Sequence, residues 1–313
     1  MTEKTTAADR QDSFLITVAL CTHNHADRLP RTLVDLGKLT SPSSPWEILL
    51  VDNASTDETP TLLADTAWQP PGVPVRIVHE KCLGLSSARN RAIKEARGKY
   101  LLFVDDDETP DPRWLTAYEH DMLAYTPDAL GGRIDVLFEH GERPSWLQDE
   151  LLGFLGHLDH GEGCWLSEPD TPFYGGNFAV RIDIFPEVGE FDADLGRKGQ
   201  ANTGGEDTEF YRRLVAANYR VRWVPGAIIN HRIRADKLWK SYFLDLHYRQ
   251  GMSEGSRTRG DRKRLPPKYL FGQLGRAIKI ALQRRFKQGK DHSLRLEMNA
   301  TYFLGYIKGW MAR

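Results

Sequence analysis

The sequence predicts an α/β fold, in which a mostly parallel β-sheet flanked by helices is followed by a basic helical extension. From residue 14 to residue 104, apolar segments of strand length alternate with amphipathic segments of helix length. Polar and acidic residues follow these apolar segments directly, as expected at the carboxyl ends of parallel strands, where the active sites of such sheets lie. Residues 256–313 contain 15 Lys and Arg but only three Asp and Glu.

The first half of the chain provides the parallel sheet. We expect strands at residues 14–21 (FLITVALC), 46–51 (WEILLV), 73–78 and 100–104 (YLLFV), and helices at residues 27–39, 57–67 and 86–96. Asp27 is a candidate cap of the first helix. Because strands and helices alternate, the helices should cover both faces of the sheet.

The second half is less regular. Residues 139–172 are rich in Gly, His, Trp and Pro, which predicts a long loop with short helices. We expect strands at residues 173–181, 219–224 and 227–231, a helix at 208–218, and three helical stretches from residue 235 that break near Gly260 and Gln288.

Composition excludes several classes of protein. Of the 313 residues, 40% are hydrophobic and 27% charged, which is typical of a globular chain. Since no run approaches ~18 apolar residues, we expect no membrane span. Residues 1–13 are polar and contain acids, so we expect a disordered tail and not a secretory signal. Cys21, Cys82 and Cys164 are far apart, which argues against a disulfide framework or zinc site and fits a cytoplasmic protein.

The charge is unevenly distributed. Residues 1–255 hold 27 Lys and Arg against 40 Asp and Glu (−13), whereas residues 256–313 carry +12. A basic, partly apolar helical region is compatible with peripheral contact to an anionic bilayer. It is equally compatible with a solvated surface, or with packing against the acidic part of the same chain.

Four consecutive acids follow the strand predicted at residues 100–104. Crowding Asp105, Asp106, Asp107 and Glu108 is costly unless a cation neutralises them. Asp105 and Asp107 alternate, so both can point the same way and hold Mg²⁺ or Mn²⁺ through oxygen ligands. The alternative is a solvated acidic turn that caps the next helix.

Further candidates lie in the second half. Glu206 and Asp207 precede a predicted helix, where the helix dipole keeps carboxylates ionised, so they are either a helix cap or a general base. His231 ends a predicted strand and is either a third metal ligand or a packing residue. Trp165 is either a platform for a sugar ring or a core residue.

Five segments, in this order, resemble the family-2 glycosyltransferases with the GT-A (Rossmann-like) fold. They span roughly residues 14–231 and comprise VALCTHNHADRL (18–29), VDNASTDET (51–59), GLSSARNRAIKEARGKYLLFVDDDE (84–108), GGNFAVR (175–181) and GEDTEFYRRL (205–214). The resemblance implies a catalytic domain at residues 14–234, with a nucleotide-binding half (14–108) and an acceptor half (109–234), followed by the basic helical region at 235–313.

The resemblance also implies roles for individual residues. The expected nucleotide-sugar contacts are Thr22, Asn24, Asp52, Arg89, Asp105 and Asp106. Asp105 and Asp107 match the DxD motif that holds Mn²⁺ or Mg²⁺ on the diphosphate, and His231 matches a further metal ligand of some members. Acceptor and sugar contacts are expected at Gly175, Gly176, Asn177 and Trp165. Asp207 matches the general base, with Glu206 as the alternative.

The expected reaction is inverting transfer of a single sugar from a nucleotide-diphosphate sugar, with a bias toward uridine, to an acceptor hydroxyl. The QxxRW motif of processive members has only a faint counterpart at residues 283–286 (QRRF), which lacks its Trp, so repeated addition is not expected. A lipid-linked acceptor in cell-envelope or exopolysaccharide assembly, at the inner face of the membrane, fits the basic region. No nucleic-acid partner is expected.

Two other functions stay open. A sugar nucleotidyltransferase uses a similar sheet and metal, but would open with a Gly-rich basic loop where this chain has Thr22, His23, Asn24 and His25. A non-catalytic nucleotide-sugar binding protein would lack the DxD motif or the carboxylate at position 207, and this chain has both.

Overall fold

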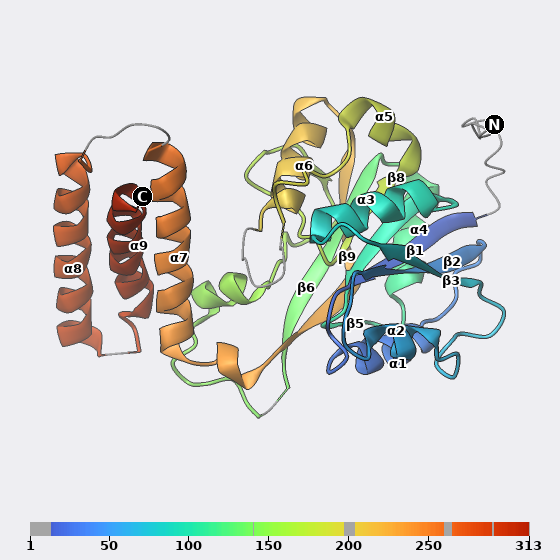
Figure 1. The fold of residues 1–313 in the computed structure, drawn as a ribbon, viewed down its shortest axis with the longest axis horizontal. Coiled ribbons are helices and arrows are strands. Elements are labelled where there is room, and N and C mark those ends of the chain that lie inside the picture. The colour runs from blue at the N-terminus through green and yellow to red at the C-terminus, as the bar shows by residue number, and fades with distance from the viewer. Residues whose placement is uncertain (1–13, 140, 197–203, 260–264, 290, 313) are drawn as a thin grey trace. The chain divides into compact units, whose positions relative to one another are not determined.

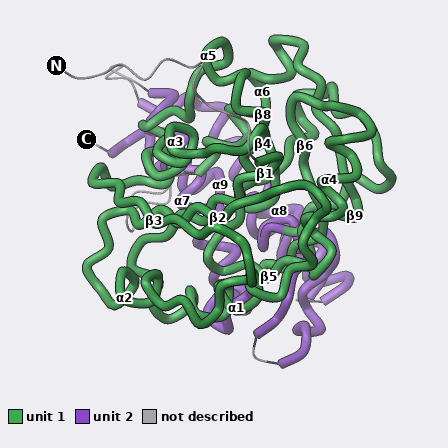
Figure 2. Tube along the Cα trace, turned by 90° about the vertical axis from the view of Figure 1, so that its right-hand side faces the viewer, with its two compact units in different colours: residues 1–135, 157–231 green, residues 136–156, 232–313 purple. Residues whose placement is uncertain are grey.

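The computed structural model describes residues 14–139, 141–196, 204–259, 265–289 and 291–312. The tail at residues 1–13 and the helix break predicted near Gly260 lie outside this part of the chain. The chain divides into two compact units, residues 1–135 with 157–231 and residues 136–156 with 232–313 (Figure 2). This division groups residues 136–156 with the C-terminal helices.

A mixed sheet organises the first unit, in the order β3-β2-β1-β4-β8-β6-β9-β5 (Figure 1). Its parallel part is built from β1 (Phe14–Thr22), β2 (Trp46–Asn53), β3 (Val75–Glu80) and β4 (Gly98–Asp105). Its antiparallel part contains β5 (Glu108–Pro110), β6 (Ala129–Phe138), β8 (Phe178–Arg181) and β9 (Val221–Ile233), and β7 (Trp165–Leu166) pairs with β9.

Helices cover both faces of the sheet, as predicted. Successive residues of a strand point to opposite faces, and β1 accordingly sends Ala19 into one core and Leu20 into the other. The first core packs beneath α3 (Leu85–Glu95) and α6 (Glu206–Ala216), and the second beneath α1 (Leu29–Gly37) and α4 (Trp114–Tyr125) (Figure 1). The shorter helices of this unit are α2 (Thr59–Ala64), η3 (Ile182–Ile184) and α5 (Phe185–Val188).

The antiparallel part differs from the sequence prediction. Strands β5 and β6 were not predicted, and helix α4 was expected only as the helix that follows the acidic turn. Gly131 and Gly132 obscure the pattern of β6, where a Cβ at Gly131 would lie 2.6 Å from the Cβ of Phe173. The strand predicted at residues 173–181 begins only at Phe178, because a turn precedes it. The two strands predicted around Pro225 form the single strand β9, in which Pro225 lies between the residues that pair with β7 and those that pair with β5.

The second unit contains the three predicted C-terminal helices, α7 (Lys240–Arg259), α8 (Lys268–Gln288) and α9 (Leu294–Met311), with the short helices η2 (Asp149–Leu155) and η4 (Ala235–Lys237). Helix α9 packs against both α7 and α8. It approaches α7 closely at glycines, since a Cβ at Gly251 would lie 2.1 Å from the carbonyl oxygen of Tyr302. Within the described residues, no helix combines the length and the apolar character needed to cross a bilayer.

Candidate active site

The acidic turn at residues 105–108 lies where β4 ends and β5 begins. Because β5 is antiparallel to β9, Glu108 pairs with His231 in register, which brings a residue 123 positions later to the turn. Strand β4 lies between β1 and β8 in the sheet, so the turn also lies beside the loop that follows β1. The sheet topology therefore assembles the site from three distant segments.

Two of the four acids point into the protein. Asp106 Oδ2 accepts hydrogen bonds from Thr22 Oγ1 and from His25 Nδ1, both at 2.6 Å, and Asp106 and Thr22 are buried. The hydrogen bond from His25 to Asp106 raises the pKa of His25, against the opposing effect of burial. Thr22 and Asp106, which were predicted to contact the nucleotide sugar, are thus hydrogen-bonded to each other instead.

Glu108 supports the turn from inside. Its Oε2 accepts a hydrogen bond from the Asp105 backbone N–H (2.9 Å), and its side chain is buried. Burial and the nearby charge of Asp105 raise the pKa of Glu108 well above its usual value. Gly176 makes room for this carboxyl, since a Cβ at that position would lie 2.0 Å from Glu108 Oε1.

The other two acids, Asp105 and Asp107, have different basic neighbours. Asp107 Oδ2 lies 3.5 Å from His231 Nε2 and 3.4 Å from Arg28 Nη1. Asp105, whose side chain is 35% exposed, places Oδ1 3.3 Å from Arg89 Nη2. The predicted ligands Asp105, Asp107 and His231 are not gathered into one cluster. Indeed, the described residues contain no group of three His, Cys, Asp or Glu arranged to hold a metal ion.

Arg89 connects the acidic turn to the start of α6. Its guanidinium donates to Glu206 Oε1 (2.9 Å), to the Gly175 carbonyl oxygen (3.0 Å) and to Asp105. The side chain is buried, and its guanidinium lies near the ring of Phe103. Burial opposes the charge of Arg89, but Asp105 and Glu206 outweigh it and raise its pKa. Arg89 thus lies at the site without being open to a nucleotide.

The two candidate bases differ in environment. Glu206 is buried and paired with Arg89. Asp207 is partly exposed; its Oδ2 accepts from the Gly175 N–H (2.7 Å) and its Oδ1 from the Thr208 N–H (2.6 Å). An ionised carboxylate has further acceptor capacity beyond these two bonds, so Asp207 can also accept a proton from a bound hydroxyl.

Two predicted sugar contacts have other roles. Asn177 is fully buried: its Nδ2 donates to the carbonyl oxygens of Arg133 and Ala227, and its Oδ1 accepts from Trp114 Nε1 and Tyr118 OH. It therefore ties the residue before β8 to β6, β9 and α4, and its buried side chain is not open to a sugar.

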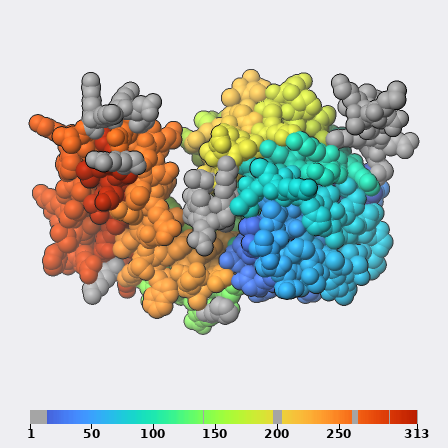
Figure 3. All heavy atoms as spheres, in the orientation of Figure 1, coloured from blue at the N-terminus to red at the C-terminus, as the bar shows by residue number. Residues whose placement is uncertain are grey.

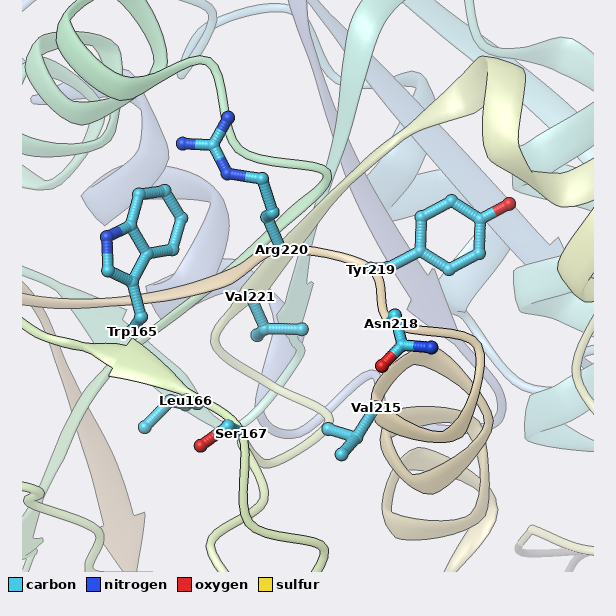
Figure 4. Close-up of a pocket in the computed structure, with 8 residues that line it drawn as sticks. All are labelled: Trp165, Leu166, Ser167, Val215, Asn218, Tyr219, Arg220 and Val221. Carbon is cyan, nitrogen blue, oxygen red and sulfur yellow. The ribbon is translucent and has the colours of Figure 1, made fainter.

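Trp165 lies far from the carboxylates. It pairs with Arg222, nine residues before His231 on β9, which corresponds to about 30 Å of extended strand. There it lines a cavity of about 340 Å³ together with the end of α6 (Figure 4). The guanidinium of Arg220 lies 4.4 Å from its ring centre. Trp165 is thus not part of the site around Asp105 and Asp207.

The remaining candidates order the loops after β1 and β2. Asn24 has a left-handed backbone (φ 51°) and its Oδ1 accepts from the Thr56 N–H (2.7 Å). Asp52 Oδ2 lies 3.0 Å from Nδ1 of His79, an exposed residue at the end of β3 that sequence reasoning missed. In the parallel sheet, Asp52 lies in register with Thr22 on one side and with His79 on the other. This register is the signal that could have identified His79.

The sequence matches one protein family over more than half of its length. The family model described as Glycosyl transferase family 2 matches residues 17–189. A Glucosyl-dolichyl phosphate glucuronosyltransferase of Haloferax volcanii is 28% identical over 153 residues, which are 48% of each chain, so the match spans about half of that relative. The Succinoglycan biosynthesis protein ExoM of Rhizobium meliloti is 25% identical over 245 residues, covering 77% of this chain and 74% of ExoM.

The fold also matches solved structures. The mannosyltransferase PcManGT of Pyrobaculum calidifontis, solved in complex with GDP-Man and Mn²⁺, superimposes with a TM-score of 0.61 at 16% identity, covering 97% of this chain and 89% of that protein. The mixed α/β sheet flanked by helices is therefore that of GT-A glycosyltransferases, as predicted from the sequence.

Proposed function

The chain belongs to glycosyl transferase family 2, and we propose that it moves one sugar from a nucleotide-diphosphate sugar to an acceptor hydroxyl, with inversion at the anomeric carbon. One observation carries the proposal: Arg89 joins the acidic turn of β4 to the carboxylates that begin α6. The proposed metal-assisted phosphate site and the proposed general base would thereby lie in one region of the protein. The likeness to PcManGT, solved with a nucleotide sugar and Mn²⁺, supports the class of donor.

In this proposal Asp207 is the base and Glu206 is a structural partner of Arg89. An acceptor hydroxyl beside Asp207 would lose its proton to this carboxylate as it attacks the anomeric carbon, and the nucleoside diphosphate would leave on the opposite side. The Gly175 N–H fixes the orientation of Asp207, while the pairing of Glu206 with Arg89 removes it from proton transfer.

Asp107 and His231 fit a divalent cation. Their oxygen and nitrogen atoms lie 3.5 Å apart, close to the ~3.0 Å between adjacent ligands of an octahedral ion with bonds of ~2.1 Å. Asp105, which starts the same turn, is the second carboxylate proposed to face the diphosphate of the nucleotide sugar. Mn²⁺ or Mg²⁺ bound here would offset the charge that develops on the leaving diphosphate.

The acceptor is proposed to be lipid-linked. The relative from Haloferax volcanii is named for a dolichyl phosphate and ExoM for succinoglycan, which supports a role in cell-envelope or exopolysaccharide synthesis. The proposal places the protein in the cytoplasm, at the inner face of the membrane, with a uridine diphosphate sugar as the first donor to test.

A donor panel tests the function directly. We expect release of a nucleoside diphosphate from one nucleotide sugar, dependent on Mn²⁺ or Mg²⁺ and abolished by EDTA. Release of pyrophosphate from a nucleoside triphosphate and a sugar phosphate would instead identify a nucleotidyltransferase. Calorimetric binding of a nucleotide sugar without turnover on any acceptor would identify a binding protein.

A further inference from the structure

Helix α8 has two apolar faces, although only one of them packs within its unit. On the inner face Leu270 and Ala281 are buried, and Leu270 joins a cluster with Tyr306 and Trp310 of α9. A surface helix of a globular unit usually has one apolar stripe and a polar remainder. The outer face of α8 departs from that pattern.

The outer face carries an apolar stripe of four exposed side chains. Phe271, Ile278, Leu282 and Phe286 are 52%, 44%, 48% and 86% exposed. At 3.6 residues per turn these four side chains lie within about 80° of one another around the helix axis. Their Cα atoms span about 22 Å along the axis. Scattered single apolar residues need no explanation, but an aligned set of this length marks a surface that meets a partner.

The charge of α8 identifies the class of partner. The helix has no Asp or Glu and six basic residues, all exposed, namely Lys268, Arg276, Lys279, Arg284, Arg285 and Lys287. Of these, Lys268 and Lys279 flank the stripe on one side, and Arg285, on the other side, pairs with Glu297 of α9. Two copies of this surface would repel each other, whereas a sheet of anionic headgroups would complement it.

We propose that the outer face of α8 docks on an anionic lipid bilayer, with the helix lying in the plane of the interface. Phe271, Ile278, Leu282 and Phe286 enter the boundary between headgroups and acyl chains, while Lys268 and Lys279 contact the phosphates. Amphipathic helices with a basic polar face and aromatic residues on the apolar face bind bilayers in this way. The inference deepens the proposed function, because it names the surface that brings the enzyme to a lipid-linked acceptor.

Side chains of α8 form part of the molecular surface drawn in orange-red in Figure 3. Tyr269 and Ile280 are also exposed but lie about 160–180° around the helix from Phe271. They provide a control, because their replacement removes exposed apolar surface from a different side of the same helix.

The test is flotation of the full chain with vesicles at low salt. Wild type is expected to float with vesicles of equal phosphatidylglycerol and phosphatidylcholine, and to stay behind with phosphatidylcholine alone. Phe271→Ser with Phe286→Ser should weaken binding by more than about tenfold. Tyr269→Ser with Ile280→Ser should bind as wild type does. Circular dichroism verifies that each variant keeps its helices.

A second pair of variants tests the charges. Lys268→Gln with Lys279→Gln, beside the stripe, should weaken binding by roughly 30-fold, since each basic residue near an anionic surface contributes about fivefold. Arg276→Gln with Lys287→Gln, on the far side of the helix, should have a smaller effect. Equal losses in the two pairs would show attraction by overall charge and overturn docking through this face.

Other outcomes also overturn the proposal. Failure of wild type to float with the vesicles that contain phosphatidylglycerol does so directly. Self-association of wild type that is lost with Phe271→Ser and Phe286→Ser, seen by sedimentation without vesicle binding, would assign the stripe to a second copy of the chain. Vesicle binding is measured without donor or acceptor, so its failure is distinct from failure of sugar transfer, and release of nucleoside diphosphate with a soluble acceptor should be unchanged in all four double variants.

Discussion

Replacing each of the two neighbouring carboxylates at the start of α6 separates a chemical role from a structural one. Asp207→Asn removes the charge that accepts the proton of the acceptor hydroxyl. General-base catalysis contributes ~10²–10⁴-fold, so kcat should fall by that factor. This corresponds to about 3–5 kcal/mol in the activation free energy.

The contacts of Asp207 predict a small effect on folding. Its two oxygens each accept one backbone hydrogen bond, from Gly175 and from Thr208. An Asn amide keeps one acceptor oxygen, so one of the two bonds is lost, at a cost of about 1 kcal/mol in the free energy of unfolding. Donor affinity, measured by calorimetry, should change little.

Glu206→Gln is the matched comparison. The Glu206 carboxylate is buried 2.9 Å from Arg89, so its neutralisation leaves a buried guanidinium with less compensating charge. Breaking such a pair costs ~3–5 kcal/mol, and this is an upper bound here because Asp105 still faces Arg89. We expect a larger drop in Tm than for Asp207→Asn, and a smaller drop in kcat.

Steady-state release of nucleoside diphosphate at saturating donor, together with thermal unfolding, distinguishes the two roles. Loss of kcat at unchanged Tm in Glu206→Gln, with activity retained in Asp207→Asn, would contradict these assignments. That pattern would make Glu206 the base.

Three further perturbations have defined outcomes. Asp107→Asn should abolish transfer and weaken Mn²⁺ binding in calorimetry while leaving Tm within a few degrees of wild type; full activity in EDTA would contradict the metal assignment. Gly176→Ala places a Cβ 2.0 Å from Glu108 Oε1 and should destabilise by ~1–3 kcal/mol in denaturant unfolding, whereas Gly153→Ala, with open space around the new Cβ, serves as the control. Burial, with Arg295 nearby, lowers the pKa of His247 to about 4, so between pH 6.5 and pH 4 the unfolded chain binds more protons and stability should fall on acidification. His247→Phe should flatten that dependence in urea titrations, and an unchanged pH profile would argue against it.

The parallel half of the fold could be predicted from the sequence because its pattern is local. Strands β1, β2 and β4 are runs of buried apolar residues bounded by polar ones, and the intervening helices follow at typical spacing. The antiparallel half could not be predicted in this way. Strand β6 contains adjacent glycines that are explained only by the close approach of Phe173 and Ala227, which come from distant parts of the chain.

The same distinction applies to the candidate site. The acidic turn and the carboxylates of α6 stand out in sequence because each follows or precedes a regular element. Whether a given side chain faces solvent depends on contacts between segments. Asp106 and Asn177 both belong to motifs from which substrate contacts were predicted. In the structure, Asp106 is hydrogen-bonded to Thr22, and Asn177 is buried and makes four hydrogen bonds within the protein. Arg28 and His79 were missed, because only the register of the parallel strands and the loop after β1 bring them to carboxylates.

The buried Arg89 couples the acidic turn at residues 105–108 to the carboxylates that begin α6. A buried charge is tolerated only where partners compensate it, and here Asp105 does so at Nη2 and Glu206 at Nη1. The orientation of Asp105 is therefore linked to α6, and any change at Glu206 should be felt at the donor side. Asp107 is oriented separately, by Arg28 and His231. Loss of Glu206 should consequently affect donor binding through Asp105 while leaving the Asp107–His231 pair, and with it the affinity for Mn²⁺, largely intact.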